Sequence, residues 1–258
     1  MNSLRIILFS ILDSEPEDSN NYIIAKYILD NYSRLAGISL TNLAKQCNVS
    51  KASVSRFCRK LGLYDYIDLQ MLIRLNSNDI SYRNDKLSIE QQKQIFCNEL
   101  NNSTLNMVKI INDPVVEELI SDIIKYNSIS IFGHLQSSHI AYTLRNNLAM
   151  LSKFCFCSQV FTEQKKKILE STPKDLLIIF SSSGNFFKRL DINMNNLEKN
   201  INSKVYLISF ENDDITLNNV KKIYLGKEYQ DLISNITMNM LVNYLSYRVA
   251  SSVSFYET

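Results

Sequence analysis

The chain has 258 residues, of which 45% are hydrophobic and 21% are charged, and these proportions exclude a chain that is disordered throughout. The length suits one large domain or two of ordinary size. Because the formal net charge is only +2, the protein as a whole is not a polycation, and any strongly basic surface must be local.

The first apolar segment, LRIILFSIL, predicts a helix rather than a signal peptide. Leu4, Leu8 and Ile11 lie on one helical stripe. The segment holds a single basic residue, lacks a small-residue cleavage site and leads into the acidic sequence DSEPED. No apolar run reaches the length that crosses a bilayer, so we expect no membrane partner.

The cysteines favour a reducing compartment. They are odd in number and scattered, no C-x-x-C occurs, and the chain has only two histidines. This pattern predicts neither a disulfide framework nor a zinc site, and it indicates a cytoplasmic protein without a metal or another cofactor. The five are Cys47, Cys58, Cys97, Cys155 and Cys157.

Residues 39–63, SLTNLAKQCNVSKASVSRFCRKLGL, predict two short helices joined by a tight turn. The apolar stripe of the first helix is Leu40, Leu43, Ala44 and Cys47, and that of the second is Val54, Phe57, Cys58 and Leu61. Between them, Asn48 tolerates the left-handed conformation and Ser50 is a good N-cap, while Gly62 stands where the second helix would stop. This is the layout of a helix-turn-helix, whose second helix enters the DNA major groove.

The exposed face of the second helix supplies chemistry that suits double-stranded DNA. Six basic residues and no acidic residue lie between Asn31 and Tyr64, and cations on one helix face neutralise phosphates. An arginine near the helix start can also bind a guanine edge with two hydrogen bonds. A helical hairpin with a solvated basic face is the alternative. The candidate DNA-binding residues are Ser50, Lys51, Ser53, Arg56, Arg59 and Lys60.

Helical periodicity before and after this motif predicts an all-helical domain over residues 1–75. Further helices are expected at 22–31 and 64–75. The polar, poorly periodic stretch 76–88 predicts a linker, and a long helix follows it. Residues 76–112 are therefore expected to be a linker and a connecting helix.

From residue 113 the pattern changes to an α/β domain that runs to residue 258. Asp113 and Pro114 predict the start of a helix. Short apolar runs at 128–132, 153–157, 175–180, 204–210 and 221–225 predict five strands, with helices at 138–151, 161–171, 187–200 and 230–250 and a shorter one near 213–219. Near-continuous apolar strands that alternate with helices indicate a doubly wound, five-stranded parallel sheet.

Two strand-to-helix loops of this sheet are candidates for a small-anion site. Free backbone N–H groups and the helix dipole favour an anion at such loops, and serine hydroxyls add donors. The alternative is that these serines only cap their helices. The candidate ligand-binding residues are Gly133, Ser137 and Ser138 after the first strand, and Ser181, Ser182, Ser183 and Asn185 after 175–180.

The N-terminal motif resembles the helix-turn-helix of RpiR-type transcriptional regulators, in which V-S-x-x-[ST]-V-x-R-F-x-x-x-L-G recurs. The matching residues are Val49, Ser50, Ser53, Val54, Arg56, Phe57, Leu61 and Gly62. The C-terminal part resembles the sugar isomerase (SIS) domain of that family, which binds phosphosugars. Its S-x-S-G loop matches at Ser181, Ser183 and Gly184, and its G-x-G-x-S loop matches only at Gly133 and Ser137.

The chain departs from the SIS pattern at three positions of these loops. Leu135 replaces the second glycine, Phe186 replaces a phosphate-binding threonine, and Lys188 replaces a frequent glutamate. Phe186 removes a hydroxyl and adds bulk, whereas Lys188 adds a cation. These changes leave open a different ligand, or a domain that only forms dimers.

The resemblance implies a DNA-binding regulator of carbohydrate metabolism that senses a phosphosugar or a related small anion. A homodimer that reads a palindromic operator is the expected assembly, and we expect no catalytic residue. One alternative is a regulator whose SIS-like domain is a ligand-blind dimerisation module. The other is a sugar-phosphate isomerase or lyase, for which His134 and Glu228 are the acid–base candidates.

Overall fold

The chain forms two compact units in a computed structural model. The first comprises residues 1–86 together with 187–192, and the second comprises residues 87–186 and 193–258. The structure describes residues 4–35, 37–61, 63, 65–77, 87–134, 136–182, 184, 186–190, 192, 201–211, 219–226 and 231–253.

The first unit is helical, as the periodicity predicted. Its elements are α1 (Leu4–Ser14), α2 (Asn20–Asp30), a 3-10 turn (Tyr32–Arg34), α3 (Leu40–Gln46), α4 (Lys51–Lys60) and α5 (Tyr66–Ser77). Ser19 and Ser39 cap α2 and α3, because each side chain accepts a hydrogen bond from a backbone N–H of the first turn.

One hydrophobic core holds these helices together. Leu8 of α1, Ile24 of α2, Leu43 of α3 and Phe57 of α4 are fully buried in it. Burying side chains of this size stabilises a fold by about 1.5–3 kcal/mol each. Helix α4 therefore packs against α2, α3 and α5, and side chains on its other side, such as Lys51 and Arg56, are exposed.

The second unit is an α/β domain. Its helices are α6 (Ile89–Ile111), α7 (Pro114–Lys125), α8 (Gln136–Met150), α9 (Phe161–Leu169) and α12 (Asp231–Val253). Its strands are β1 (Ser128–Gly133), β2 (Asp175–Phe180), β3 (Lys204–Ser209) and β4 (Val220–Tyr224). The short helix α10 (Phe186–Arg189) begins at the last residue before the segment 187–192, which belongs to the first unit. Asp113 caps α7 and Pro114 begins it, as predicted.

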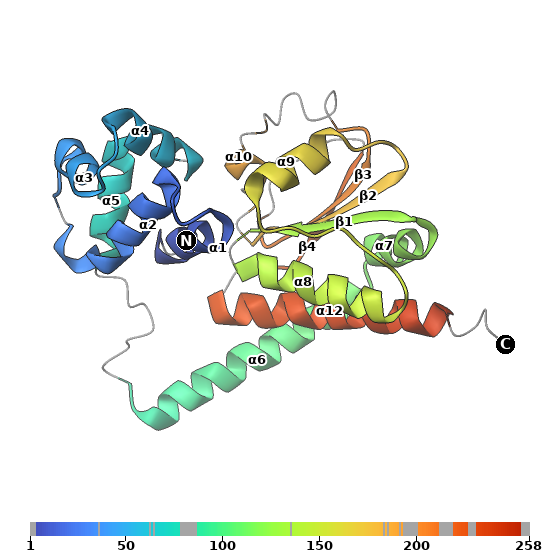
Figure 1. Cartoon of the computed structure of the whole chain (residues 1–258). Helices are drawn as coiled ribbons and strands as arrows, with labels where there is room; N and C mark the ends of the chain where they lie inside the picture. Colours follow the sequence, from blue (N-terminus) through green and yellow to red (C-terminus); the bar gives the residue numbers. More distant parts are fainter. Residues whose placement is uncertain are drawn as a thin grey trace. The chain divides into compact units, whose positions relative to one another are not determined.

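The four strands form a parallel sheet in the order β1-β2-β3-β4. Helices α8 and α12 lie on one face of the sheet and α9 lies on the other (Figure 1). Alternate strand residues on both faces are fully buried, among them Ile131 and Ile178 on one face and Phe132 and Ile179 on the other. Gly133 is in register with Phe180, so the loops after β1 and β2 leave the same edge of the sheet.

The prediction of a five-stranded sheet is wrong for the described residues. The run 153–157 makes one isolated parallel bridge, Ser130 to Phe156, with two backbone hydrogen bonds to β1. Phe154 is 82% exposed, and Ser158 already begins the turn into α9 by accepting from the N–H of Val160. The segment is therefore too short and too open to continue the ladder.

The prediction of a helix over 187–200 is wrong beyond Arg189, because α10 ends there and the described residues Leu190 and Ile192 are not helical. α5, α8 and α12 begin and end within about three residues of their predicted bounds. Most of the predicted helices at 187–200 and 213–219, and most of the predicted linker 76–88, lie outside the described residues.

Candidate nucleic-acid interface and ligand loops

The turn between α3 and α4 has the conformation that its sequence predicted. Asn48 has a φ of 50°, and the N–H of Val49 donates to the carbonyl of Ala44 at 2.9 Å. Ser50 caps α4 by accepting from the N–H of Ser53 at 3.0 Å. The two helices therefore meet in a well-defined helix-turn-helix.

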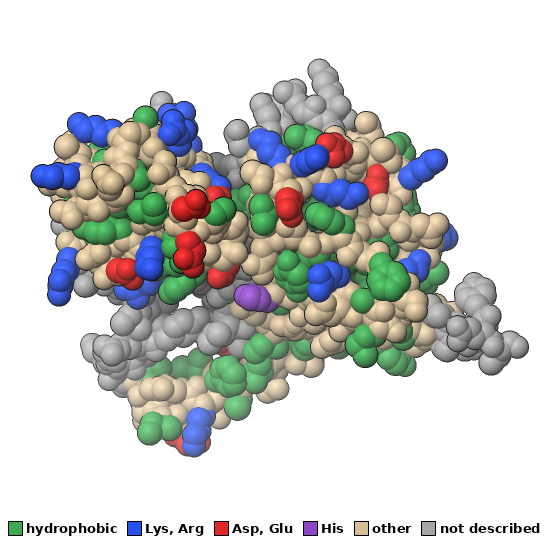
Figure 2. Space-filling model, viewed as in Figure 1, with side chains coloured by type: hydrophobic (Ala, Val, Ile, Leu, Met, Phe, Trp, Pro, Cys, Tyr) green, Lys and Arg blue, Asp and Glu red, His purple; other side chains and the backbone are tan. Residues whose placement is uncertain are grey.

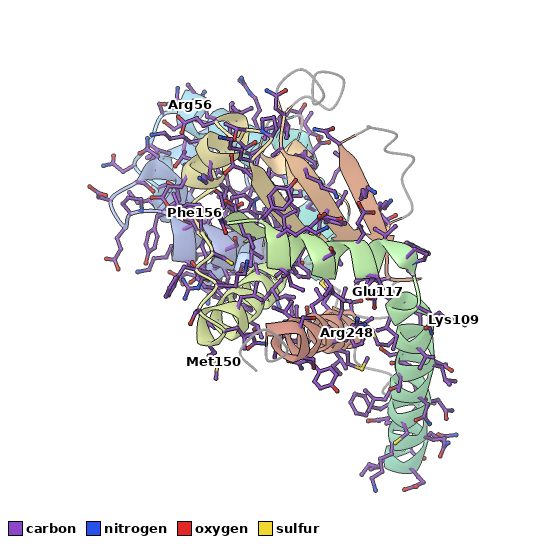
Figure 3. The ribbon with its side chains drawn as sticks, turned by 90° about the vertical axis from the view of Figure 1, so that its right-hand side faces the viewer. Arg56, Lys109, Glu117, Met150, Phe156 and Arg248 are labelled. Carbon is purple, nitrogen blue, oxygen red and sulfur yellow. The ribbon has the colours of Figure 1, made fainter. Side chains whose placement is uncertain are left out.

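Helix α4 has one buried face and one basic face. Val54, Phe57 and Cys58 are fully buried. On the other side, Lys51, Arg56 and Arg59 are exposed, and Arg56 lies at the periphery of the helical unit (Figure 3). Figure 2 shows Lys and Arg side chains gathered over α3 and α4.

Ser53 differs from the other candidates because it is buried, with 5% of its surface exposed. Its hydroxyl lies 2.9 Å from Ser50 Oγ. It also accepts from Asn20 Nδ2 of α2 at 3.2 Å and from Arg56 Nη2 at 3.1 Å. The structure thus gives Ser53 protein partners on three sides and no open side for DNA.

Lys60 is also engaged with the protein. Its ammonium forms an ion pair with the carboxylate of Glu15 at the end of α1, and both side chains are largely covered. Glu15 offsets this charge at the end of α4. The exposed cations of the helix are Lys51 at its start, Arg56 in its middle and Arg59 in its last turn.

The two candidate ligand loops lie side by side, as their strand order predicted. Ser137 Oγ, in the first turn of α8 just after the β1 loop, is 3.2 Å from Ser182 Oγ, in the loop after β2. Ser137 and Ser181 are buried, and Ser138 and Ser182 are half-buried. Ser183, Asn185 and Leu135 lie outside the described residues.

Gly133 allows the first loop to turn tightly into α8. A Cβ at this position would lie 2.3 Å from the backbone oxygen of Ser137, a distance that no side chain tolerates. In the second loop, Gly184 has a φ of 67° and its N–H donates to the carbonyl of Ser181 at 3.1 Å. Both glycines are therefore required by the backbone.

An aromatic cluster lies next to these loops. His134 is 6% exposed, and its ring stacks on Phe186 at 4.3 Å and contacts Phe161 at 4.4 Å between centroids. His134 Nε2 lies 2.8 Å from Oε1 of Gln164, which is itself fully buried. Phe186 therefore packs into the protein, at the position where the SIS pattern has a threonine.

Phe161 and Gln164 belong to this site although the sequence patterns did not indicate them. They lie on α9, about thirty residues after His134, and nothing in their local spacing relates them to the first loop. Only the packing of α9 against the sheet brings them to the edge where the loops leave.

Four of the five cysteine side chains are buried or half-buried and pack against other residues of the protein. Burial raises the pKa of Cys47, Cys58, Cys155 and Cys157 to about 11, so these four are protonated at neutral pH. Among the described residues, no group of three or more His, Cys, Asp and Glu side chains is placed to hold a metal ion. Within the same residues, no helix is long and apolar enough to span a membrane.

Fold and geometry define a helix-turn-helix protein with a second, α/β unit built on a parallel sheet. Residues 14–78 match the family described as "Helix-turn-helix domain, rpiR family". The N-terminal unit is therefore a helix-turn-helix domain of the rpiR family, and the resemblance to RpiR-type regulators is confirmed.

Two relatives are described as uncharacterized HTH-type transcriptional regulators. One, from Caldanaerobacter subterraneus subsp. tengcongensis, is 28% identical over 46% of this chain and 44% of its own length. The other, encoded in the aarA 3′ region of Providencia stuartii, is 24% identical over 63% of this chain and 60% of its own length. The chain thus spans about half the length of these relatives.

Two solved structures share the fold. The Vibrio vulnificus NanR protein, complexed with ManNAc-6P, covers 98% of this chain and 94% of its own at 18% identity, with a TM-score of 0.54. The phosphoheptose isomerase GmhA from Neisseria gonorrhoeae covers 64% of this chain and 100% of its own at 12% identity, with a TM-score of 0.50.

Proposed function

We propose that this chain is a cytoplasmic, DNA-binding transcriptional regulator of carbohydrate metabolism. The observation that carries the proposal is helix α4, which presents Lys51, Arg56 and Arg59 from a capped, well-supported helix-turn-helix. We assign DNA binding to residues 1–75, the connection to residues 76–112, and sensing and dimerisation to residues 113–258.

Duplex binding tests the regulator proposal directly. Operators are selected from a random duplex library with the full chain, and affinity is then measured by fluorescence anisotropy at several salt concentrations. Because each phosphate contact releases counterions, affinity should fall steeply as salt rises. Arg56→Ala should weaken operator binding, while Lys26→Ala, a loss of an exposed cation on α2, should not. No salt-sensitive affinity for any duplex would refute the proposal.

For the second unit we propose that a phosphosugar, or a small anion of that kind, binds at the loops after β1 and β2. Support comes from the adjacent hydroxyls of Ser137 and Ser182 and from the fold shared with a protein complexed with ManNAc-6P. A ligand that binds only the native state raises the melting temperature. At a ligand concentration of about 100 times the Kd, binding stabilises the folded state by about 2.7 kcal/mol. In a chain of this size, that raises the melting temperature by roughly 5 °C.

A ligand-blind dimerisation module is the second candidate for this unit. It is favoured by Phe186, which is 1% exposed and stacks on His134. A thermal-shift screen of hexose, hexosamine and ManNAc 6-phosphates separates the two candidates, since this alternative expects no shift with any of them. A turnover assay with the same compounds tests the isomerase alternative. His134 is buried against Gln164, and Glu228 lies outside the described residues.

We further propose that helix α6 pairs with α6 of a second copy. Ile89, Phe96, Ser103 and Ile110 repeat every seven residues along one stripe. Ser103 and Ile110 are buried against the unit, and Ser103 Oγ is 2.5 Å from Thr237 Oγ1 of α12. Ile89 and Phe96 are 74% and 47% exposed, on the half of α6 that extends away from the other helices of its own unit (Figures 1 and 3).

Charge supports a second copy as the occupant of this stripe. Lys93 and Glu99 each lie three residues from Phe96, on opposite sides. A two-fold axis at Phe96 would therefore bring Lys93 of one copy level with Glu99 of the other, twice per dimer. A dimer of this kind suits a palindromic operator.

A further inference from the structure

The hydroxyl of Ser53 has a complete set of hydrogen bonds, and this set fixes the direction of each one. A serine hydroxyl can donate once and accept twice. Asn20 Nδ2 and Arg56 Nη2 are donors, so they occupy both acceptor positions of Ser53 Oγ. The proton of Ser53 must therefore point to Ser50 Oγ, 2.9 Å away.

The same count applies to Ser50. Its oxygen accepts from the Ser53 hydroxyl and from the N–H of Ser53, which uses both of its acceptor positions. Its own proton is left to donate outward from the first turn of α4. A chain of hydrogen bonds thus runs from α2 through a buried hydroxyl to the exposed start of α4.

The guanidinium of Arg56 is part of this chain. One of its N–H groups is held by Ser53, one helical turn earlier, and the side chain itself is exposed. Arg56 is the sixth of the ten residues of α4, the helix that enters the groove in helix-turn-helix proteins, and its other N–H groups belong to an exposed side chain. Two parallel donors of this kind are the group that reads the O6 and N7 edge of guanine.

We propose that Ser53 is a specificity-determining positioning residue, which holds Arg56 in a base-reading orientation and which α2 supports through Asn20. The inference rests on the proposed DNA binding. Ordering a long side chain on binding costs affinity, and an arginine that is already ordered avoids that cost. Only the base-reading contact of Arg56 gains affinity from this ordering. Loss of Ser53 should therefore lower the affinity for the operator and leave the affinity for non-specific DNA unchanged.

The test compares Ser53→Ala and Ser53→Thr with the unaltered full chain. Affinities are measured for the selected operator and for a scrambled duplex of the same length. Ser53→Ala should weaken operator binding by about three- to ten-fold and leave the scrambled duplex unchanged. Ser53→Thr keeps the oxygen and should restore binding. Ser55→Ala, a half-buried serine of the same helix, is the matched control and should bind like the unaltered chain.

A double-mutant cycle separates positioning from a general loss of structure. If Ser53 acts through Arg56, Ser53→Ala should add nothing in an Arg56→Ala background. Asn20→Ala should give a smaller loss with the same selectivity. Equal losses on both duplexes, or full additivity with Arg56→Ala, would overturn the inference while the proposed function stands. A chain with no duplex affinity at all would overturn both.

Discussion

Ser137 and Ser182 come from loops that follow neighbouring strands, and their hydroxyls are 3.2 Å apart. Ser53 and Ser50 make a second hydroxyl pair, on α4. In each pair one serine is buried and the other reaches solvent. At the residue scale, each pair therefore joins a buried hydroxyl to one that is at least partly exposed.

Gly133→Ala tests how closely the first ligand loop is packed. The added Cβ would lie 2.3 Å from the backbone oxygen of Ser137, so the first turn of α8 would have to move. We expect the free energy of unfolding to fall by about 2–4 kcal/mol, measured by urea denaturation. Ser138→Ala, a truncation in the same turn, should cost less than about 1 kcal/mol. An unchanged midpoint for Gly133→Ala would contradict the close packing.

At the element scale, α6 and α7 are attached to the α/β unit in different ways. α6 buries only its second half. α7 is tied to the sheet by charges, because the carboxylate of Glu118 lies 2.7 Å from Lys204 of β3 and 2.5 Å from Lys221 of β4. α7 is also tied to α12, through the ion pair of Glu117 with Arg248, both labelled in Figure 3.

Phe96→Asp tests the proposed pairing of α6. A charge at the centre of the exposed stripe should convert the dimer to a monomer, with the mass measured by light scattering. Gln94→Asp places the same charge on another exposed position of α6 and should leave the dimer intact. Lys93→Glu should weaken the dimer, and the double variant Lys93→Glu, Glu99→Lys should restore it.

Cys97 offers an independent readout of the same pairing. It is exposed on α6, whereas burial raises the pKa of the other four thiols to about 11 and slows their reaction. A short bismaleimide should therefore link two copies through Cys97, and Cys97→Ser should abolish the link. A dimer that survives Phe96→Asp and resists cross-linking would show that another surface mediates assembly.

The ion pairs of Glu118 predict a pH dependence of stability. Hydrogen bonds from Lys204 and Lys221 lower the pKa of Glu118 from 4.5 to about 2. A carboxyl whose pKa is lower in the folded state stabilises the fold above its ordinary pKa, and this contribution is lost as the pH falls from about 4.5 towards 2. Because Glu118 is 35% exposed, solvent screening limits the contribution of its ion pairs to the free energy of unfolding to about 1 kcal/mol.

Glu118→Gln should therefore be less stable than the unaltered chain at pH 7 and equally stable near pH 2. Urea denaturation across this pH range measures the difference. Glu170→Gln, which alters an exposed carboxylate of the same unit, should show no such convergence. A constant difference at every pH would mean that the carboxamide perturbs packing rather than charge.

For the whole molecule, the proposed function requires communication between the helix-turn-helix and the SIS-like unit. A ligand shifts such an equilibrium only if it binds one arrangement of the paired DNA-binding domains more tightly. Linkage is reciprocal, so the ligand and the operator must change each other's affinity by the same factor.

Any sugar phosphate that raises the melting temperature should therefore change operator affinity, by about 5- to 150-fold for a typical coupling. The operator should change the affinity for that sugar phosphate by the same factor, which isothermal titration calorimetry measures. A compound that stabilises the protein without changing operator affinity would show binding without regulation. Inorganic sulfate at equal ionic strength controls for screening.

The sequence by itself determined the features that depend on neighbours along the chain. The left-handed turn at Asn48, the cap at Ser50, the start of α7 at Pro114 and the four strands of the sheet were all predicted. Periodicity, capping and turn chemistry act over a few residues, so a single sequence expresses them. The adjacency of the two ligand loops also followed, because parallel strands end at one edge.

Only the tertiary structure decided which of the candidate side chains already have partners within the protein. The pairing of Lys60 with Glu15, the burial of Ser53 under Asn20, and the stack of His134 on Phe186 join residues 33 to 52 positions apart. Residues 153–157 make only one bridge to β1, and this limit also depends on tertiary packing. Local sequence patterns cannot predict such contacts, because the contacts form only when elements far apart in the sequence pack together.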